Sequence, residues 1–390
     1  MKQKHSHFLI PGILLLGIVL RAPFTTLSTV LSDIASGLGV EVSSLGLLTS
    51  LPLLTFAIFS PFAASWAKRF GIERLFLGVL IVMTLGSALR TLNLPLLYVG
   101  TMLVGAGIAF INVLLPSLIQ ANEPNQLGFL TTLYITAMGL STAVASSVAV
   151  PITKATSWQG LVWVLTAVCA LALVIWLPNV RHNHYLEQDT STSENSGSWY
   201  KSGKVWAIMI FGGLQSLFFY TTITWLPTMA TQAGVGEANA GILASVFTLT
   251  SIPFSMIVPS LITKLSNRNR HVMLVATVLA GLVGVAMLLV NTNSFVYWLV
   301  LNLLIGSSAS VLFPYMMVVF SMKASSPEKT AQLSGFAQTG GYIFAALGPV
   351  LFGSSKQLFN SWTPAVLILL ALTLIMGIAL YKVEKTDVIL

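Results

Sequence analysis

Charged side chains are scarce in this sequence of 390 residues, because Asp, Glu, Lys and Arg together make up only 8% of it. A soluble domain carries about 25% charged residues, so this chain lacks the groups that would cover a water-facing surface. Hydrophobic residues instead reach 55%, and the mean hydropathy is +0.87. The composition therefore predicts a protein of the lipid bilayer with no separate soluble domain.

Cysteine is almost absent as well, since Cys169 is the single one in the chain. One cysteine excludes an intramolecular disulfide and a Cys-based metal site. The sequence also has no Gly-rich phosphate loop, no metal-ligand cluster and no nucleophile–base pair such as an intramembrane hydrolase requires. We therefore expect no enzymatic activity, no cofactor and no metal.

Acidic residues are missing from the middle of every long apolar run. The eleven that the chain contains fall in loops or near the ends of such runs, as Asp33, Glu73 and Glu123 do. A carrier of organic cations, or one driven through a buried carboxylate, normally has an acid within the membrane. The sequence therefore disfavours both kinds of carrier.

Long apolar runs of about 20 residues, enough to cross a bilayer, are what the chain has in abundance. We expect an all-α membrane protein with twelve transmembrane helices, near 8–31, 45–66, 73–92, 96–119, 128–151, 159–178, 204–230, 239–263, 271–291, 295–320, 331–353 and 361–381. A polar, Ser/Thr-rich stretch divides them into a six-helix bundle over 1–180, a cytoplasmic linker over 181–203 and a second six-helix bundle over 204–390. His182 and His184 lie in this linker, where a solvated position is favoured over a metal site.

The distribution of Lys and Arg predicts the orientation of these helices. Both residue types gather in loops on one side, and only Lys154 and Lys356 fall on the other. By the positive-inside rule both termini are then cytoplasmic. The formal net charge of +8 has the same origin, so we expect a monomeric, multi-pass protein of a bacterial cytoplasmic membrane and no nucleic-acid partner.

The two halves of the chain also repeat one another weakly. Pro116 pairs with Pro314 and Pro151 with Pro349, each at an offset of 198 residues, and similar segments begin at 46 and 241. Internal symmetry of this kind is typical of transporters that alternate about a site at the bilayer midplane. The pattern predicts two pseudo-symmetric bundles and favours a transporter over a receptor or a structural protein.

Two basic residues lie within apolar runs and are candidate functional residues. Arg21 stands thirteen residues after Phe8, about 20 Å along a helix, with Thr25 and Ser28 following on the same face. With no intramembrane acid to pair it, Arg21 is expected to contact carbonyl groups, water or an anionic ligand, and a structural role is the alternative. Arg90 lies nearer a helix end, where a side chain that reaches the interface and a second basic or gating site are both open.

Further polar side chains fall on helices expected to line a central cavity. Such groups also hold helices together through hydrogen bonds, so each one alone supports substrate contact and helix packing equally. Together with Arg21 and Thr25 they predict a small cavity with one positive charge, several neutral donors and aromatic walls, formed by Asn112, Tyr134, Gln215, Tyr220, Gln338 and Tyr342.

Several of these segments carry a family resemblance. The chain resembles the major facilitator superfamily and, within it, the cyanate and 2-nitroimidazole transporter family. The resemblance rests on "LRAPFTTLSTVL" around Arg21, "ALR" ending at Arg90, "NVLLPSLI" at 112–119, "GLQSLFFYTTITWLP" at 213–227 and "LSGFAQTGGYIFAALGP" at 333–349. It implies the major facilitator fold and transport of a small-molecule substrate.

The loop between the second and third predicted helices departs from the superfamily pattern. "SWAKRFGIER" keeps Lys68, Arg69 and Gly71 of the motif but has Ala67 where the superfamily usually has Asp. Another group, such as Glu73 or a helix dipole, then has to hold this loop.

We expect a secondary transporter that moves a small anionic or polar solute, such as cyanate, with Arg21 binding its negative charge. Protons are one candidate coupling ion. The alternative is an efflux carrier for nitroimidazoles or other heteroaromatic compounds, in which aromatic walls including Trp225 dominate. A membrane sensor built on a transporter fold is a third reading, but the chain has no attached signalling domain.

Overall fold

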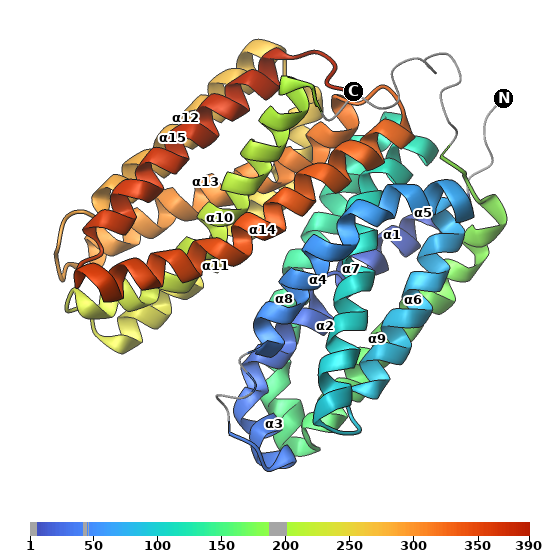
Figure 1. Ribbon diagram of the computed structural model, residues 1–390, viewed down its shortest axis with the longest axis horizontal. Coiled ribbons are helices and arrows are strands. Elements are labelled where there is room, and N and C mark those ends of the chain that lie inside the picture. Colours follow the sequence, from blue (N-terminus) through green and yellow to red (C-terminus); the bar gives the residue numbers. More distant parts are fainter. Residues whose placement is uncertain (1–5, 42–44, 46, 187–200) are drawn as a thin grey trace. The chain divides into compact units, whose positions relative to one another are not determined.

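The computed structural model describes residues 6–41, 45, 47–186 and 201–390, and these residues form helices and no strand (Figure 1). The all-α membrane fold with twelve transmembrane segments is confirmed. The first segment is built from α1 (Leu9–Val19), α2 (Ala22–Thr25), a 3-10 helix (Thr26–Val30) and α3 (Leu31–Leu38), and the second from α4 (Leu47–Phe59), a 3-10 turn (Ser60–Phe62) and α5 (Ala63–Phe70). The next four are α6 (Ile72–Leu89), α7 (Leu94–Asn122), α8 (Leu127–Ala155) and α9 (Trp158–Trp176). The last six are α10 (Gly203–Gln232), α11 (Glu237–Lys264), α12 (Asn267–Met287), α13 (Phe295–Met322), α14 (Pro327–Phe359) and α15 (Thr363–Lys385).

Several helices run further than their apolar cores. α7 has 29 residues and α13 has 28, which exceeds the roughly 20 needed to span a bilayer. Polar caps define where they begin: the Asn93 side chain accepts from the Leu96 amide at 3.0 Å, and Ser294 caps α13 in the same way. A cap satisfies backbone donors that would otherwise lack partners, so the helix extends to the capping residue.

Contacts divide the chain into two compact units. Unit 1 comprises Met1–Ser191 and Ser325–Thr339, and unit 2 comprises Thr192–Ala324 and Gly340–Leu390. Unit 1 therefore contains the first six segments together with the beginning of α14, whose remainder belongs to unit 2.

The packing inside the two units repeats. In unit 1, α7 packs on α4 and α6, and α9 packs on α1 and α6; in unit 2, α13 packs on α11 and α12, and α15 packs on α10 and α12. The paired prolines take equivalent places, with Pro116 inside α7 and Pro314 inside α13. The pseudo-symmetry predicted from the prolines is thus present in the helix packing.

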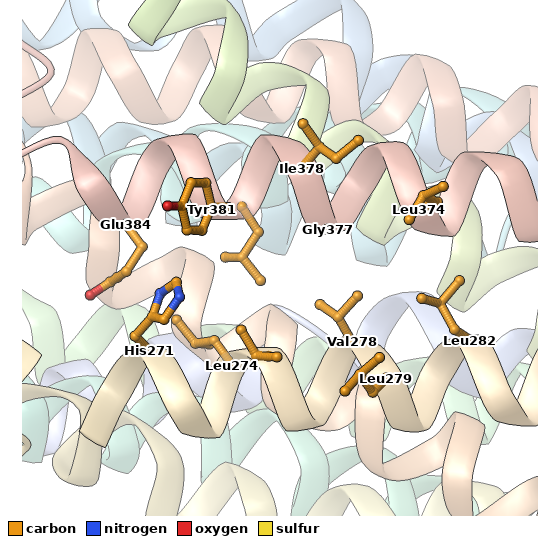
Figure 2. A pocket seen from close by; sticks show the side chains of 12 residues that line it. His271, Leu274, Val278, Leu279, Leu282, Leu374, Gly377, Ile378, Tyr381 and Glu384 are labelled. Atoms are coloured by element: carbon orange, nitrogen blue, oxygen red, sulfur yellow. The ribbon is translucent and has the colours of Figure 1, made fainter. Parts of the chain in front are cut away.

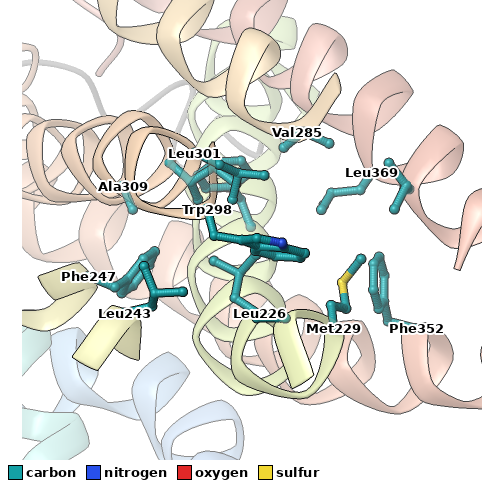
Figure 3. Packing of buried hydrophobic residues seen from close by; sticks show 14 of the residues in the cluster. Leu226, Met229, Leu243, Phe247, Val285, Trp298, Leu301, Ala309, Phe352 and Leu369 are labelled. Carbon is teal, nitrogen blue, oxygen red and sulfur yellow. The ribbon is translucent and has the colours of Figure 1, made fainter. Parts of the chain in front are cut away.

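Each unit has a hydrophobic core of its own. In unit 2, Trp298 lies among Leu226, Met229, Leu301 and Leu369, and this cluster joins α10, α13 and α15 (Figure 3). A corresponding cluster in unit 1 joins the first span to α7 and α9 through Ile34, Leu97, Trp158 and Leu161. In each unit, apolar side chains from several transmembrane segments therefore pack into one core.

Glycine brings α6 and α7 close together near the end of α6. A Cβ atom on Gly100 would lie 2.2 Å from the Gly86 carbonyl oxygen and 2.8 Å from Cγ of Arg90. We expect Gly100→Ala to lower the apparent thermal unfolding midpoint in detergent, because forcing a methyl group into a packed interface costs about 1–3 kcal/mol.

Gly78 on α6 is the matched control for this substitution. It is exposed, and a Cβ atom added there would have no neighbouring atom within 4 Å. Gly78→Ala should therefore leave the midpoint unchanged or raise it, since alanine favours the helix. Equal midpoints for the two variants would contradict the close approach of α6 and α7.

Candidate functional site

The first transmembrane segment is interrupted at Arg21. The sequence predicts one continuous helix over 8–31, but α1 ends at Val19 and α2 begins at Ala22, while Arg21 has non-helical φ and ψ angles of −125° and −53°. Pro23 lies in the first turn of α2, where it has no backbone N–H to donate to the preceding turn and so interrupts the helical hydrogen bonds. The arginine side chain is partly exposed at this break.

Hydroxyl groups after the break bond to their own backbone. Thr25 Oγ1 donates to the Arg21 carbonyl at 3.1 Å, and Ser28 Oγ donates to the Thr25 carbonyl at 2.6 Å. Side chains of this kind offer the backbone an alternative to regular helical bonding, and the chain changes here to a 3-10 helix over Thr26–Val30. The predicted stripe of Arg21, Thr25 and Ser28 therefore lies on an irregular segment.

Arg90 is fully buried at the end of α6, with an exposed fraction of 0%. Its Nη1 donates to the Pro23 carbonyl at 2.7 Å, while Nε and Nη2 have no hydrogen-bond partner among the described residues. A side chain that reaches the interface would be exposed, so that alternative is wrong. Arg90 instead links α6 to the short helix that directly follows Arg21.

Asn112 and Gln338 are brought together within unit 1. Both are buried, and Gln338 Nε2 donates to the Asn112 carbonyl at 3.1 Å and to Ser334 Oγ at 2.8 Å. Tyr134, on α8, is buried against α1, where Gly17 allows its backbone to approach. The Tyr134 hydroxyl has no hydrogen-bond partner in the part of the chain that the structure describes.

The remaining predicted residues lie in unit 2. Gln215 is buried on α10, and no described residue bonds to its Oε1. Tyr220 is partly exposed and packs edge-on against Phe219 with ring centroids 5.2 Å apart, and Phe219 in turn contacts Phe247 at 6.1 Å. Tyr342 is partly exposed on α14. Within unit 2, the predicted residues are therefore two partly exposed tyrosines and a buried amide.

Lys68 and Arg69, at the end of α5, have different partners. Lys68 forms a salt bridge with Glu328, which lies in the part of α14 that belongs to unit 1. The Arg69 guanidinium lies over the Phe70 ring, 5.4 Å from its centroid. The loop motif thus pairs one of its two cations with an acid from a distant part of the chain.

Gly71 ends this motif with a φ of +79°, and a Cβ atom there would lie 2.1 Å from the Asn183 side chain. Asn183 Nδ2 donates to the Phe70 carbonyl at 3.0 Å, and its Oδ1 accepts from the Arg74 amide at 3.0 Å. The Arg74 side chain donates to the Tyr185 hydroxyl at 3.2 Å. Residues 183–185 therefore hold the turn between α5 and α6, which requires glycine at this position.

Glu73 is 1% exposed and lies at the centre of the contacts that residues 183 and 184 make with the start of α6. Its carboxylate accepts from the His184 amide at 2.6 Å and from Asn122 Nδ2 at 3.2 Å, and it bonds to His184 Nδ1 at 2.7 Å. Trp176 Nε1 donates to the Glu73 carbonyl at 2.9 Å. One buried acid thus joins α6, α7 and the segment after α9. Ala67, which stands in place of the motif Asp, has no side-chain group for such bonds.

Unit 2 has an equivalent set of contacts, in which the acid and the basic residue have exchanged places. Arg270 Nε donates to Glu384 at 2.6 Å, and the Tyr315 hydroxyl donates to the same carboxylate at 2.6 Å. Arg270 stands 197 residues after Glu73, close to the repeat offset of the prolines. α12, α13 and α15 are therefore joined as α6, α7 and α9 are, with a base at the start of α12 and an acid at the end of α15.

The contact between His184 and Glu73 predicts that the stability of the protein depends on pH. Its hydrogen bond to Glu73 raises the pKa of His184 above the ordinary value of 6.5, and partial burial opposes this rise. A group whose pKa is raised by folding stabilises the protein below the unfolded pKa, and this contribution is lost as pH rises through the raised pKa. We expect the apparent unfolding midpoint to fall as pH rises from about 6 to about 9, and to fall less in His184→Gln.

His182 is the control for this measurement, because it is exposed and two residues away. His182→Gln should keep the pH dependence of the wild-type chain. The same pH profile in His184→Gln and wild type would show that another group is responsible.

Sequence reasoning missed Asn183, His184 and Arg270. The first two lie in the predicted linker, where a solvated position is expected, but His184 is partly buried and bonded to Glu73, and Asn183 bonds to the turn at Gly71. The signal in the sequence is Glu73, an acid at the start of the third span that follows a loop motif without its usual Asp.

Comparisons with known proteins follow the same line. The profile of the Major Facilitator Superfamily matches residues 13–349 and 208–388. The uncharacterized transporter YycB of Bacillus subtilis (strain 168) is 34% identical over 383 residues, which is 97% of this chain and 94% of that protein. The 2-nitroimidazole transporter of Escherichia coli (strain K12) is 34% identical over 378 residues, 96% and 95% of the two chains.

More distant likenesses agree with these. The cyanate transport protein CynX of Escherichia coli (strain K12) is 24% identical over 359 residues, 90% of each chain. Among solved structures, the transporter FucP in the outward conformation matches with a TM-score of 0.74 at 13% identity, covering 97% of this chain and 99% of that chain. The proton:xylose symporter XylE matches with a TM-score of 0.77 at 11% identity, covering 96% and 95%. These structures share the fold.

Proposed function

Because this chain belongs to the major facilitator superfamily, with the 2-nitroimidazole and cyanate transporters among its relatives, we propose that it is a secondary transporter for a small anionic solute. Membrane transport rather than catalysis follows from the family itself. The charge of the solute, its size and the alternating-access movement are the proposal.

The observation that carries the proposal is the position of Arg21. This arginine is partly exposed where the first span is interrupted between α1 and α2. A cation inside a membrane segment is costly and marks a substrate or ion pathway by default. Broken helices with irregular backbone are tolerated at membrane depth where they are buried in protein or line a cavity, and the partial exposure of Arg21 favours a cavity. An anion that contacts the guanidinium would offset the cost of placing this charge there.

Neutral groups complete the proposed site. We propose that these groups are Thr25, Asn112, Tyr134 and Gln338, which belong to unit 1, and Gln215, Tyr220 and Tyr342, which belong to unit 2. Gln215 Oε1 and the Tyr134 hydroxyl, which no described residue bonds, support roles beyond helix packing, since buried polar atoms normally have partners. Arg90 supports the site through the backbone beside Arg21.

The organisation in the membrane completes the proposal. The chain acts as a monomer in the bacterial cytoplasmic membrane with both termini in the cytoplasm, and its bundles are 1–180 and 204–390 with a linker over 181–203. Coupling through a proton carried by a protonatable substrate fits a chain whose acids lie near the ends of its apolar runs and not in their middle.

A second candidate is an efflux carrier for nitroimidazole-like compounds. The aromatic set of Phe219, Tyr220 and Phe247 in unit 2 favours it, since a planar heteroaromatic ring stacks well on aromatic side chains. Cells that lack or overproduce the protein would then differ in their tolerance of these compounds.

Uptake into proteoliposomes tests both candidates. Labelled small anions and labelled nitroimidazoles are offered with and without imposed pH and voltage gradients. Selective accumulation of an anion that depends on one of these gradients supports the first proposal. Movement of the neutral heteroaromatic compounds alone refutes it and supports the second.

A further inference from the structure

A groove lies between α12 and α15 in unit 2, with a volume of about 260 Å³. Figure 2 shows its two walls, with Leu282 and Leu374 at one end and His271, Tyr381 and Glu384 at the other. Between the two ends the lining is aliphatic, as at Leu274, Val278, Leu279 and Ile378. The groove is thus an apolar trough that ends at a polar group of side chains.

Gly377 shapes the floor of this groove. A Cβ atom on Gly377 would lie 2.8 Å from Cγ1 of Val278, so the two helices approach closely at this position. Aliphatic side chains on either side of the contact, such as Leu279 and Ile378, are exposed. In a membrane protein such a trough faces the lipid acyl chains.

Basic side chains gather at the polar end of the groove. His271 packs edge-on against Tyr381 with ring centroids 5.2 Å apart, and the Lys385 ammonium lies 5.2 Å from the centre of the same ring. Helical periodicity places Arg268 one turn before His271 on the α12 wall, as Lys385 stands one turn after Tyr381 on the α15 wall. Arg268 and Lys385 are exposed, so these two cations continue the walls past His271, which lines the end of the groove.

Glu384 does not cancel this charge. Its carboxylate accepts hydrogen bonds from Arg270 and from Tyr315, both at 2.6 Å, and it is 9% exposed. The acid is therefore satisfied inside the unit by the buried Arg270. Asp387 is the other acid nearby and is exposed at the end of the chain, two residues beyond Lys385.

We propose that this groove binds an anionic phospholipid. One acyl chain lies along the trough between α12 and α15, and the phosphate group contacts Arg268, His271 and Lys385. Basic side chains at the membrane end of a gap between transmembrane helices favour anionic headgroups, and a tail in the trough fixes the headgroup beside them.

Charge argues for a lipid over a second copy of this chain. Two copies in one membrane have the same orientation, and a two-fold interface places the same patch of each copy against the other. Arg268 and Lys385 of one copy would then face the same two cations of its partner. An anionic lipid meets these cations with the opposite charge.

Lipid retention by the purified full-length protein tests the proposal. The chain is extracted from nanodiscs that contain equal amounts of phosphatidylglycerol and phosphatidylethanolamine, and the retained lipids are counted by native mass spectrometry. We expect wild type to retain phosphatidylglycerol preferentially. Removing Arg268 and Lys385 together as glutamines should reduce this preference about 25-fold, or about fivefold for each cation.

Lys204 and Lys264 provide the matched control. Both are exposed cations at helix ends, on α10 and α11 and not on the two helices that form the groove, so Lys204→Gln with Lys264→Gln changes the net charge equally. This control should change the preference less than twofold. As a measurement without any variant, phosphatidylglycerol added to the wild-type protein in detergent should raise its unfolding midpoint more than phosphatidylethanolamine does.

Three results would overturn the proposal. Equal retention of the two lipids by wild type is one, and an equal loss of preference in the two double variants is another. The third is a dimer that forms as lipid is removed and that is broken by the Arg268 and Lys385 substitutions, which would assign the groove to a second copy.

Discussion

Replacing Arg21 with glutamine is expected to reduce transport of an anionic substrate about 10- to 100-fold while leaving the protein folded. A hydrogen bond to a charged group contributes about 1.5–3 kcal/mol, and glutamine keeps a donor but loses the charge. Because Arg21 is partly exposed at a helix break and not packed in a core, the unfolding midpoint should change little. Initial rates of uptake into proteoliposomes, measured against substrate concentration, give the effect directly.

Two companion variants identify the reason for such a loss. Arg21→Lys keeps the charge but loses the planar fork of donors, so it should retain part of the activity. Thr25→Ala removes a hydroxyl group of the proposed site that bonds to the Arg21 carbonyl but leaves the positive charge, so it should reduce transport less than Arg21→Gln does. Unchanged affinity and rate in Arg21→Gln would remove Arg21 from the binding site.

The twelve spans could be predicted because hydropathy alone places them. Each predicted apolar run corresponds to an observed segment, and the repeat of prolines foretold the repeat of helix packing. The ends of the helices were less accurate, since capping by residues such as Asn93 extends helices past their apolar runs. The break at Arg21 was missed because apolar residues continue on both sides of it from Phe8 to Leu31, so the run is long enough for one helix in spite of Pro23.

The contacts of Glu73 with His184 and of Arg270 with Glu384 could not be predicted, because they join segments that are distant in the sequence. His184 stands 111 positions from Glu73, and Arg270 stands 114 positions from Glu384. Each of these residues looks like an ordinary charge at a helix end when the sequence is read alone. The burial of Arg90 has the same origin, because the Pro23 carbonyl that it contacts lies 67 positions away.

Replacing Arg90 with methionine is expected to separate stability from transport. The buried guanidinium has one hydrogen bond, and two of its nitrogens have no partner among the described residues. An isolated charge in an apolar interior costs free energy, and an apolar side chain of similar volume removes that cost. The unfolding midpoint of Arg90→Met should therefore equal or exceed that of wild type. Transport should nevertheless fall at least about tenfold, because the helix that follows Arg21 loses its link to α6.

The size of this loss follows from geometry. A displacement of about 1 Å in a group that positions a substrate can reduce a rate by as much as about 100-fold, and Arg90 fixes the backbone two residues from Arg21. Arg90→Lys, which keeps a single donor within reach of the Pro23 carbonyl, should recover part of the rate and lose the gain in stability. A folded Arg90→Met protein that transports at the wild-type rate would show that the buried charge serves neither the break nor the substrate.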